Sequence, residues 1–281
     1  MFTTLISATD LAAQLDHPDW IVYDCRHDLV DTAAGARAYA QSHIRGAHHV
    51  SLDADLSGAK NGHNGRHPLP DAASFCTRMA ALGLRNNMQV VSYDATGGAF
   101  AARLWWMLRW VGYARVAVLD GGWNGWQKTG LAVSAATPPG RHGHFSGMPH
   151  AITVDADFIA AEIGNPHTRI IDARSPDRFR GENETLDPVG GHIPGATNRF
   201  FQNNLGADGC FKPAPVLKEE FAALLGNVQP AQVVHQCGSG VTACHNQLAM
   251  EIAGLSGSRL YPGSWSEWCS DSRRPAATGD H

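Results

Sequence analysis

The chain has 281 residues, 43% of them hydrophobic and 17% charged, and this composition excludes a disordered, collagen-like or low-complexity polypeptide. At roughly 100–200 residues per domain, the length predicts two domains or one large one. The 22 basic and 26 acidic side chains give a net charge of −4 without a cluster of Lys or Arg. Neither nucleic acid nor an anionic membrane is therefore an expected partner.

The cysteines and the N-terminus indicate a cellular compartment. The first residues lack the basic stretch of a secretory signal, and no apolar run reaches the length of a membrane span. Six cysteines are too few for a disulfide scaffold in this chain, and none forms a CxxC pair typical of zinc sites. We expect reduced thiols in a cytoplasmic protein, with no metal and no other cofactor.

The two halves of the chain resemble each other. The matched stretches, in chain order, are 21–26 with 170–174, 43–47 with 192–196, 90–94 with 233–237, and 120–126 with 262–268. In each half, β-rich runs alternate with helical patterns, which predicts parallel βαβ units. The fold class is therefore α/β, with two tandem domains that each contain a parallel sheet flanked by helices. A stretch rich in Pro and Gly separates them, so we expect an N-terminal domain at 1–134, a linker at 135–150 and a C-terminal domain at 151–281.

One loop differs between the halves in a way that suggests chemistry. Cys237 follows the strand run of the second half and precedes a helical pattern, whereas the first half has Asp94 at the matching position. Ligands of open α/β sheets bind at the carboxyl ends of the strands. Small residues let consecutive backbone N–H groups turn towards one point, and a helix N-terminus adds positive potential, so a thiolate is stabilised there. Cys237 is therefore the candidate nucleophile.

The run Cys237-Gly238-Ser239-Gly240-Val241-Thr242 resembles the active-site loop of the mercaptopyruvate sulfurtransferases of the rhodanese superfamily. The resemblance extends over nearly the whole chain. It is carried further by 172–174, 178–181, 191–196 and 263–268, which follow one another in the family's order.

This resemblance implies a ping-pong sulfurtransferase whose first domain is inactive. Cys237 would take a sulfane sulfur from 3-mercaptopyruvate, hold it as a persulfide, and pass it to cyanide, a thiol or thioredoxin. Ser239 would donate a hydrogen bond or a proton to the departing enolate. The implied substrate-binding residues are Arg178, Gly238, Gly240, Val241 and Thr242.

Several of these residues also have structural interpretations. The hydroxyl of Thr242 is placed to cap the following helix, and Ser239 can be simply a small loop residue. His43 and Asp31 resemble residues that face the loop from the first domain. However, His43 matches His192 in the other half, which favours a requirement of the fold. Cys244 lies two helical turns after Cys237, and its apolar neighbours favour core packing over a resolving thiol.

The sequence departs from the family pattern at one place. Mercaptopyruvate sulfurtransferases usually have a second arginine shortly before Gly-His-Ile-Pro-Gly, but residues 182–189 contain no basic residue. Thiosulfate-specific rhodaneses tend to have Arg-Lys where this chain has Gly238-Ser239, and neutral residues suit a dianionic donor less well. Mercaptopyruvate is therefore the favoured donor, with thiosulfate as the alternative.

Two other functions use a similar cysteine loop. A dual-specificity phosphatase needs an arginine six positions after its cysteine and a loop one residue longer, but position 243 is Ala. A persulfide carrier without turnover remains the non-enzymatic alternative.

Overall fold

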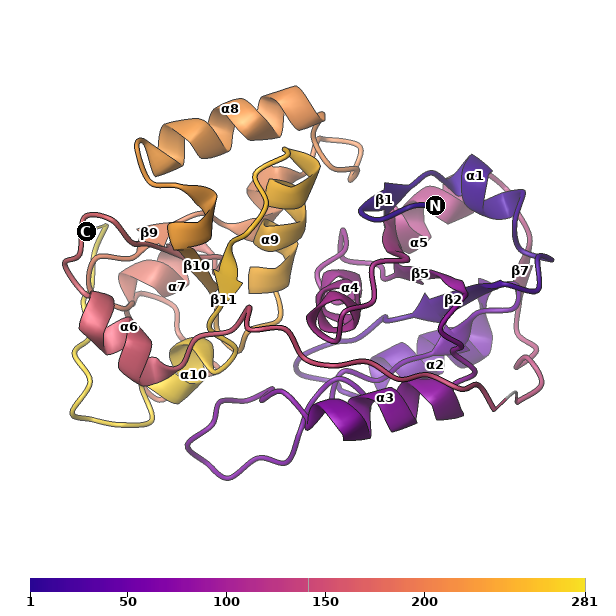
Figure 1. Cartoon of the computed structure of the whole chain (residues 1–281), viewed down its shortest axis with the longest axis horizontal. Coiled ribbons are helices and arrows are strands. Elements are labelled where there is room, and N and C mark those ends of the chain that lie inside the picture. The colour runs from indigo at the N-terminus through magenta and orange to yellow at the C-terminus, as the bar shows by residue number, and fades with distance from the viewer. Residues whose placement is uncertain (141, 281) are drawn as a thin grey trace. The chain divides into compact units, whose positions relative to one another are not determined.

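The computed structural model describes residues 1–140 and 142–280 and divides the chain into two compact units (Figure 1). Unit 1 comprises 1–58, 69–151 and 206–211. Unit 2 comprises 59–68, 152–205 and 212–281. Each half of the chain thus gives one short segment to the unit that is formed mainly by the other half. Segment 59–68 precedes α3 in the sequence but folds with unit 2.

Unit 1 is built on a parallel sheet with strand order β1-β6-β5-β2-β4. These strands are β1 (Leu5–Ile6), β2 (Trp20–Asp24), β4 (His48–His49), β5 (Gln89–Tyr93) and β6 (Val116–Leu119). An antiparallel pair is formed by β3 (His43–Ile44) and β7 (Val133–Ser134). The helices are α1 (Ala8–Ala12), α2 (Ala34–Gln41), α3 (Ala72–Ala81), α4 (Ala101–Trp110) and α5 (Gly122–Lys128).

Alternation along the strands of unit 1 gives the sheet two buried faces. Val22, Val91 and Ala117 pack with α1 and α5, through side chains such as Leu11 and Trp126, in one apolar cluster. The other face is covered by α4, which is buried along nearly its whole length. A parallel sheet covered on both faces is what near-continuous apolar strand sequences predict.

Unit 2 contains a parallel sheet with strand order β11-β10-β8-β9. The strands are β8 (Arg169–Asp172), β9 (Thr197–Asn198), β10 (Val233–Gln236) and β11 (Arg259–Leu260). The helices are α6 (Ala156–Glu162), α7 (Pro176–Arg180), α8 (Ala214–Leu225), α9 (Ala243–Ile252) and α10 (Ser264–Trp268), with short 3₁₀ turns at Phe201–Asn204 and Pro230–Gln232.

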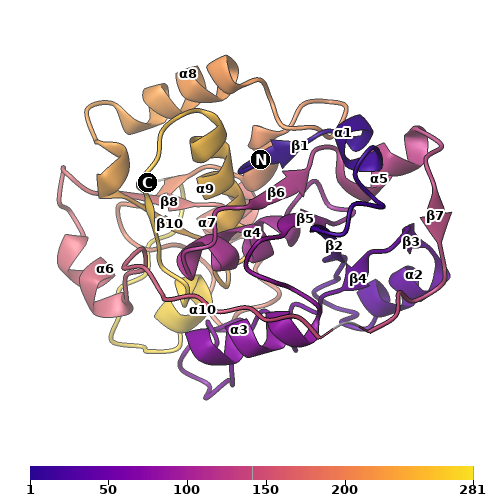
Figure 2. The ribbon, with the colours of Figure 1, turned by 45° about the vertical axis from the view of Figure 1, so that its right-hand side comes forward.

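Helices cover both faces of this second sheet as well. Ile170 and Val234 pack with α6, α7 and α10, including the buried indoles of Trp265 and Trp268. Helices α8 and α9 lie on the opposite face (Figure 2). The predicted α/β class, with parallel sheets flanked by helices, is confirmed.

The two units contain the same contacts between an aspartate, an arginine and a tryptophan at matching positions. At the end of β2, Asp24 forms an ion pair with Arg26 at 2.6 Å, and the guanidinium of Arg26 lies 4.4 Å from the ring centre of Trp123. At the end of β8, Asp172 and Arg174 pair at the same distance, and Arg174 lies 4.9 Å from the ring of Trp265. Through these contacts each arginine joins the end of its strand to a helix, which is α5 in unit 1 and α10 in unit 2.

The helices of residues 1–140 and 142–280 include none that combines the length and the apolar character needed to cross a bilayer.

Candidate active site

Cys237 lies directly after β10, a strand that has neighbours on both sides in the sheet of unit 2. It is buried, with 2% of its surface exposed. The six residues 237–242 connect β10 to α9, which begins at Ala243. The predicted sequence of strand, short loop and helix is therefore present at this cysteine.

The beginning of α10 fixes the backbone of this loop. The N–H groups of Trp265 and Ser266 donate to the carbonyls of Cys237 and Gly238 at 3.0 and 2.9 Å. In a trans peptide the N–H points away from its carbonyl, so the N–H groups of Gly238 and Ser239 point away from α10. The contacts with α10 thus orient two consecutive backbone donors in the same direction, as in loops that bind anions.

The backbone conformation at position 240 requires glycine. Gly240 has a φ of +76°, and a Cβ there would lie 2.3 Å from the carbonyl oxygen of Pro262. Only glycine avoids both the left-handed penalty and this clash.

Two guanidinium groups lie beside Gly238. A Cβ built on Gly238 would be 2.7 Å from Nη2 of Arg66 and 3.3 Å from Nη2 of Arg178. Arg178 was predicted, whereas Arg66 was not. Arg66 belongs to segment 59–68, which comes from the first half of the chain but folds with unit 2. The second guanidinium beside Gly238 therefore comes from segment 59–68 and not from residues 182–189.

Two carboxylates hold these arginines. Arg178 donates from Nε and Nη2 to Glu184, at 3.0 and 2.8 Å, and from Nη2 to Asp187 at 3.3 Å. Arg66 donates from Nη1 to the other oxygen of Asp187. Burial raises the pKa of Asp187, although the two arginines oppose this. Burial also acts to raise the pKa of Glu184, but hydrogen bonds from the amide of Leu186 and from Arg178 outweigh it and leave that pKa below its ordinary value.

Ser239 has a histidine partner that sequence reasoning missed. Its Oγ lies 2.8 Å from Nδ1 of His67, and both side chains are buried. His67 follows Arg66 in segment 59–68, and 172 residues separate it from Ser239. No spacing pattern could have joined the two. A hydroxyl paired with an imidazole can donate a hydrogen bond or pass a proton, which a merely small loop residue cannot.

Val241 and Thr242 complete the loop, and Cys244 lies in the first turn of α9. Val241 is buried, and Thr242 is the residue before α9. The expectation that Thr242 caps the helix is wrong, because its side chain makes no capping hydrogen bond. Its φ and ψ of −71° and −14° are already helical, whereas a capping side chain needs an extended backbone. Cys244 donates from Sγ to the carbonyl of Gly240 at 3.3 Å and is fully buried.

In unit 1 the matching loop contains its own anion. Asp94 is fully buried, and its carboxylate accepts hydrogen bonds from the backbone N–H groups of Thr96, Gly98, Phe100 and Ala101 at 2.7–2.9 Å. This loop, 94–100, is one residue longer than 237–242. In unit 1, a side-chain carboxylate thus occupies backbone N–H donors of the loop that matches 237–242.

His43 and Asp31 both belong to unit 1. The ring of His43 stacks on Tyr39 at 4.0 Å, and its Nδ1 lies 2.8 Å from the carbonyl of the same residue. His192 stacks on Phe179 and contacts that residue's carbonyl in the same way. This symmetry supports a role in the fold for His43. Asp31 is exposed and forms an ion pair with Arg37. Their predicted contribution to the active loop stays a prediction.

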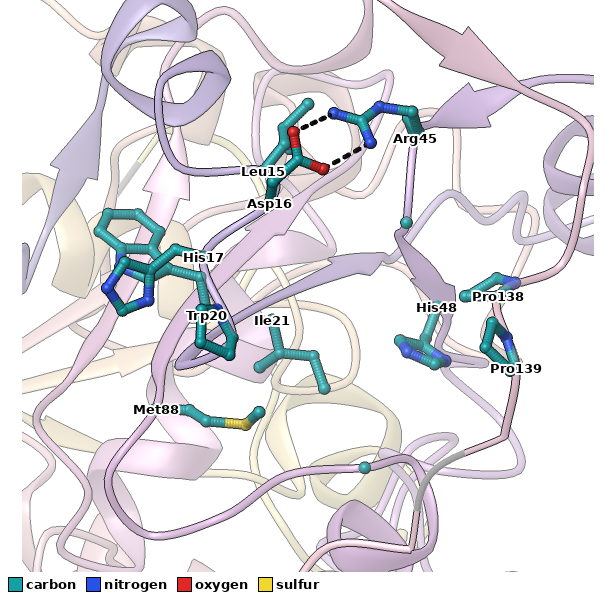
Figure 3. A pocket seen from close by; sticks show the side chains of 13 residues that line it. Leu15, Asp16, His17, Trp20, Ile21, Arg45, His48, Met88, Pro138 and Pro139 are labelled. Atoms are coloured by element: carbon teal, nitrogen blue, oxygen red, sulfur yellow. Dashed lines mark hydrogen bonds and ion pairs between the residues drawn. The ribbon is translucent and has the colours of Figure 1, made fainter.

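Unit 1 also has a cavity of about 320 Å³ between β2, β4 and the 138–139 segment (Figure 3). Arg45 and Asp16 form an ion pair at its edge, and Trp20, His48 and Met88 contribute to its lining. The residues around it include no cysteine. Among residues 1–140 and 142–280, no three His, Cys, Asp or Glu side chains are grouped to hold a metal ion.

Comparison with known proteins agrees with this geometry. The sequence model of the family described as the rhodanese-like domain matches the chain twice, at residues 7–129 and 155–271. The chain belongs to the tandem-domain rhodanese family of sulfurtransferases.

Three relatives show the range of the family. A probable 3-mercaptopyruvate sulfurtransferase of Pseudomonas aeruginosa is 50% identical over 279 residues, which cover 98% of each chain. A putative thiosulfate sulfurtransferase of Mycobacterium tuberculosis is 37% identical, over 98% of this chain and 97% of its own. The solved structure of the 3-mercaptopyruvate sulfurtransferase from Leishmania major superposes with a TM-score of 0.86 at 30% identity, over 98% of this chain and 76% of that one.

Proposed function

We propose that the protein transfers a sulfane sulfur from 3-mercaptopyruvate to a thiophilic acceptor through a persulfide on Cys237. The observation that carries the proposal is the meeting of three groups at one loop. These are a cysteine at a strand end, a pair of guanidiniums beside Gly238, and a hydroxyl paired with His67. On this proposal, 151–281 is the catalytic domain, 1–134 is the inactive copy and 135–150 is the linker. Segment 59–68 of the inactive copy folds with unit 2 and adds Arg66 and His67 to the site.

The first half-reaction uses each group. The Cys237 thiolate attacks the sulfur of the donor, an S–S bond forms, and the C–S bond breaks with its electron pair going to the carbon chain as pyruvate enolate. Arg66 and Arg178 bind the donor carboxylate through charge-assisted hydrogen bonds. Ser239, supported by His67, donates a hydrogen bond to the ketone oxygen, where the negative charge of the enolate develops. The enolate then takes a proton and leaves as pyruvate.

The second half-reaction restores the enzyme. An acceptor such as cyanide or a thiol attacks the outer sulfur of the persulfide, and the S–S electron pair returns to Cys237 as the thiolate. Gly238, Gly240, Val241 and Thr242 provide the loop that holds the outer sulfur near backbone N–H donors. A protein dithiol such as thioredoxin fits the role of acceptor, and a cytoplasmic location supplies one. The six cysteines lie in the part of the chain that the structure describes and form no disulfide there.

Thiosulfate is the second candidate donor, because a relative is named for it. In that reaction the thiolate takes the outer sulfur and sulfite leaves. The neutral Gly238-Ser239 pair disfavours a dianion.

Steady-state kinetics with each donor, and with cyanide as the acceptor, test the proposal. A higher kcat/KM for mercaptopyruvate supports it, and a higher value for thiosulfate assigns the protein to the alternative. Formation of the persulfide without turnover would show a carrier instead of an enzyme.

A further inference from the structure

Asp187 joins the two arginines of the site. Its side chain is 2% exposed, and each of its carboxylate oxygens accepts from a different guanidinium: Oδ1 from Arg66 and Oδ2 from Arg178. It lies in the segment where the family pattern has a second arginine. Here the chain has Asp187, and Arg66, which is remote in sequence, binds its carboxylate.

The carboxylates determine which nitrogens remain for a donor. Arg178 uses Nε and Nη2 on Glu184 and Asp187, and Arg66 uses Nη1 on Asp187. The atoms nearest Gly238 include Nη2 of Arg66, and Nη1 of Arg178 lies 3.6 Å from the Cβ position of that glycine. Nη2 of Arg66 and Nη1 of Arg178 thus lie beside the loop and take no part in these carboxylate hydrogen bonds, while Nη2 of Arg178, which lies 3.3 Å from the same position, is held by Glu184 and Asp187.

The same contacts change the charge of the site. Arg66 and Arg178 contribute two positive charges, and Asp187 with Glu184 contributes two negative charges. Glu184 also lies 3.5 Å from Arg174, but Arg174 is already neutralised by Asp172 at 2.6 Å. The group as a whole is therefore close to neutral. A neutral group can still form directed hydrogen bonds to one carboxylate, but it gives up the Coulomb attraction that favours a dianion over a monoanion.

We propose that Asp187 is a specificity-determining residue, which positions Arg66 and Arg178 and lowers the charge of the pair so that a monoanionic 2-keto thiol donor is selected over dianionic thiosulfate. This inference rests on the proposed function and names the feature that sets its donor preference.

The test replaces the charge of Asp187 and leaves its shape. In Asp187→Asn, the ratio of kcat/KM for thiosulfate to kcat/KM for mercaptopyruvate should rise by about fivefold or more, because the added net positive charge acts more strongly on the dianion. Asp187→Ser gives a second variant with the same expected direction. Asp187→Glu keeps the charge and should keep the ratio near that of the wild type. A purely structural role would lower both kcat/KM values together and leave the ratio unchanged.

Glu182→Gln is the matched control. Glu182 lies in the same segment and is 55% exposed, but its partner is the partly exposed Arg180 and not an arginine of the site. The control makes the same change in net charge, and it should leave the donor ratio unchanged. An equal shift in Glu182→Gln and Asp187→Asn would overturn the inference, as would an unchanged ratio in Asp187→Asn.

A binding measurement separates this inference from the proposed function. Calorimetric titration of Cys237→Ser with sodium pyruvate and with sodium sulfate uses a monoanion and a dianion that do not react. Adding Asp187→Asn should tighten sulfate binding more than pyruvate binding. If the wild type turns over neither donor, the proposed function fails. The anion titration still shows whether Asp187 controls charge selection, and equal changes for the two anions would reject that role.

Discussion

Ser264 holds the backbone of Cys237: its Oγ accepts a hydrogen bond from the N–H of Cys237 at 3.1 Å and donates one to the carbonyl of Tyr261 at 2.9 Å. Ser264 has a φ of +54°, and it is the only non-glycine residue with a positive φ among residues 1–140 and 142–280. The matching residue in unit 1 is Gly122, also with a φ of +54°. Unit 2 therefore has a strained backbone, at a cost of order 1–3 kcal/mol, where the hydroxyl of Ser264 contacts the N–H of Cys237.

Ser264→Gly should separate stability from activity. Glycine relieves the strain, and this gain offsets the loss of the two hydrogen bonds of Ser264, so the free energy of unfolding should change little. The Cys237 amide loses its partner, so kcat for sulfur transfer should fall by about threefold to tenfold, as the loss of one hydrogen bond predicts. Urea unfolding and steady-state kinetics on the same preparation measure the two effects. A variant that is less stable and fully active would contradict the positioning role.

Cys237→Ser should abolish sulfur transfer, because a hydroxyl cannot form a persulfide. It should leave the fold intact, because the change in side-chain volume is small. Wild-type protein treated with donor should gain about 32 Da on the peptide that contains Cys237. The partly exposed thiols do not compete well, since burial raises the pKa of Cys210 and of Cys269 to about 11. Both are mainly protonated at pH 8, and their thiolate forms only as the pH approaches that pKa. Peptide mass spectrometry at pH 8 that maps the gain to another cysteine would exclude Cys237 as the nucleophile.

Arg66→Ala and Arg178→Ala should each lower kcat/KM for mercaptopyruvate. The loss of transition-state stabilisation should be about 1.5–3 kcal/mol for one charge-assisted contact. The double variant should lose less than the sum, because both arginines share Asp187 and act on one carboxylate. Arg180→Ala is the control: Arg180 lies next to Phe179 but pairs with Glu182 outside the site. Unchanged kcat/KM in Arg66→Ala would remove that residue from the donor site.

The limits of sequence reasoning follow from where each signal is located. The duplication and the Cys237 loop could be recognised because each is a continuous run of residues with its own local pattern. Arg66 and His67 could not, because segment 59–68 joins unit 2 through tertiary packing that leaves no periodic trace. The prediction that Thr242 caps α9 is wrong because the backbone of Thr242 is already helical, and a capping side chain needs an extended backbone.

Asp94→Ala should destabilise unit 1 strongly. Four backbone N–H groups donate to the buried carboxylate of Asp94, and the variant leaves them without an acceptor, at a cost of about 3 kcal/mol or more. Asp71→Ala is the graded control, because the side chain of Asp71 caps α3 by accepting from the N–H of Ser74, and its loss should cost about 1 kcal/mol.

Urea unfolding of the full chain, followed by tryptophan fluorescence, measures both Asp94→Ala and Asp71→Ala. Sodium formate should partly restore the stability of Asp94→Ala and leave that of Asp71→Ala unchanged, because only the buried loop presents several converging donors to a small anion. If the two variants lose equal stability, or if formate restores neither, the loop of unit 1 is held by its packing alone. The carboxylate of Asp94 would then not be the internal anion that its hydrogen bonds indicate.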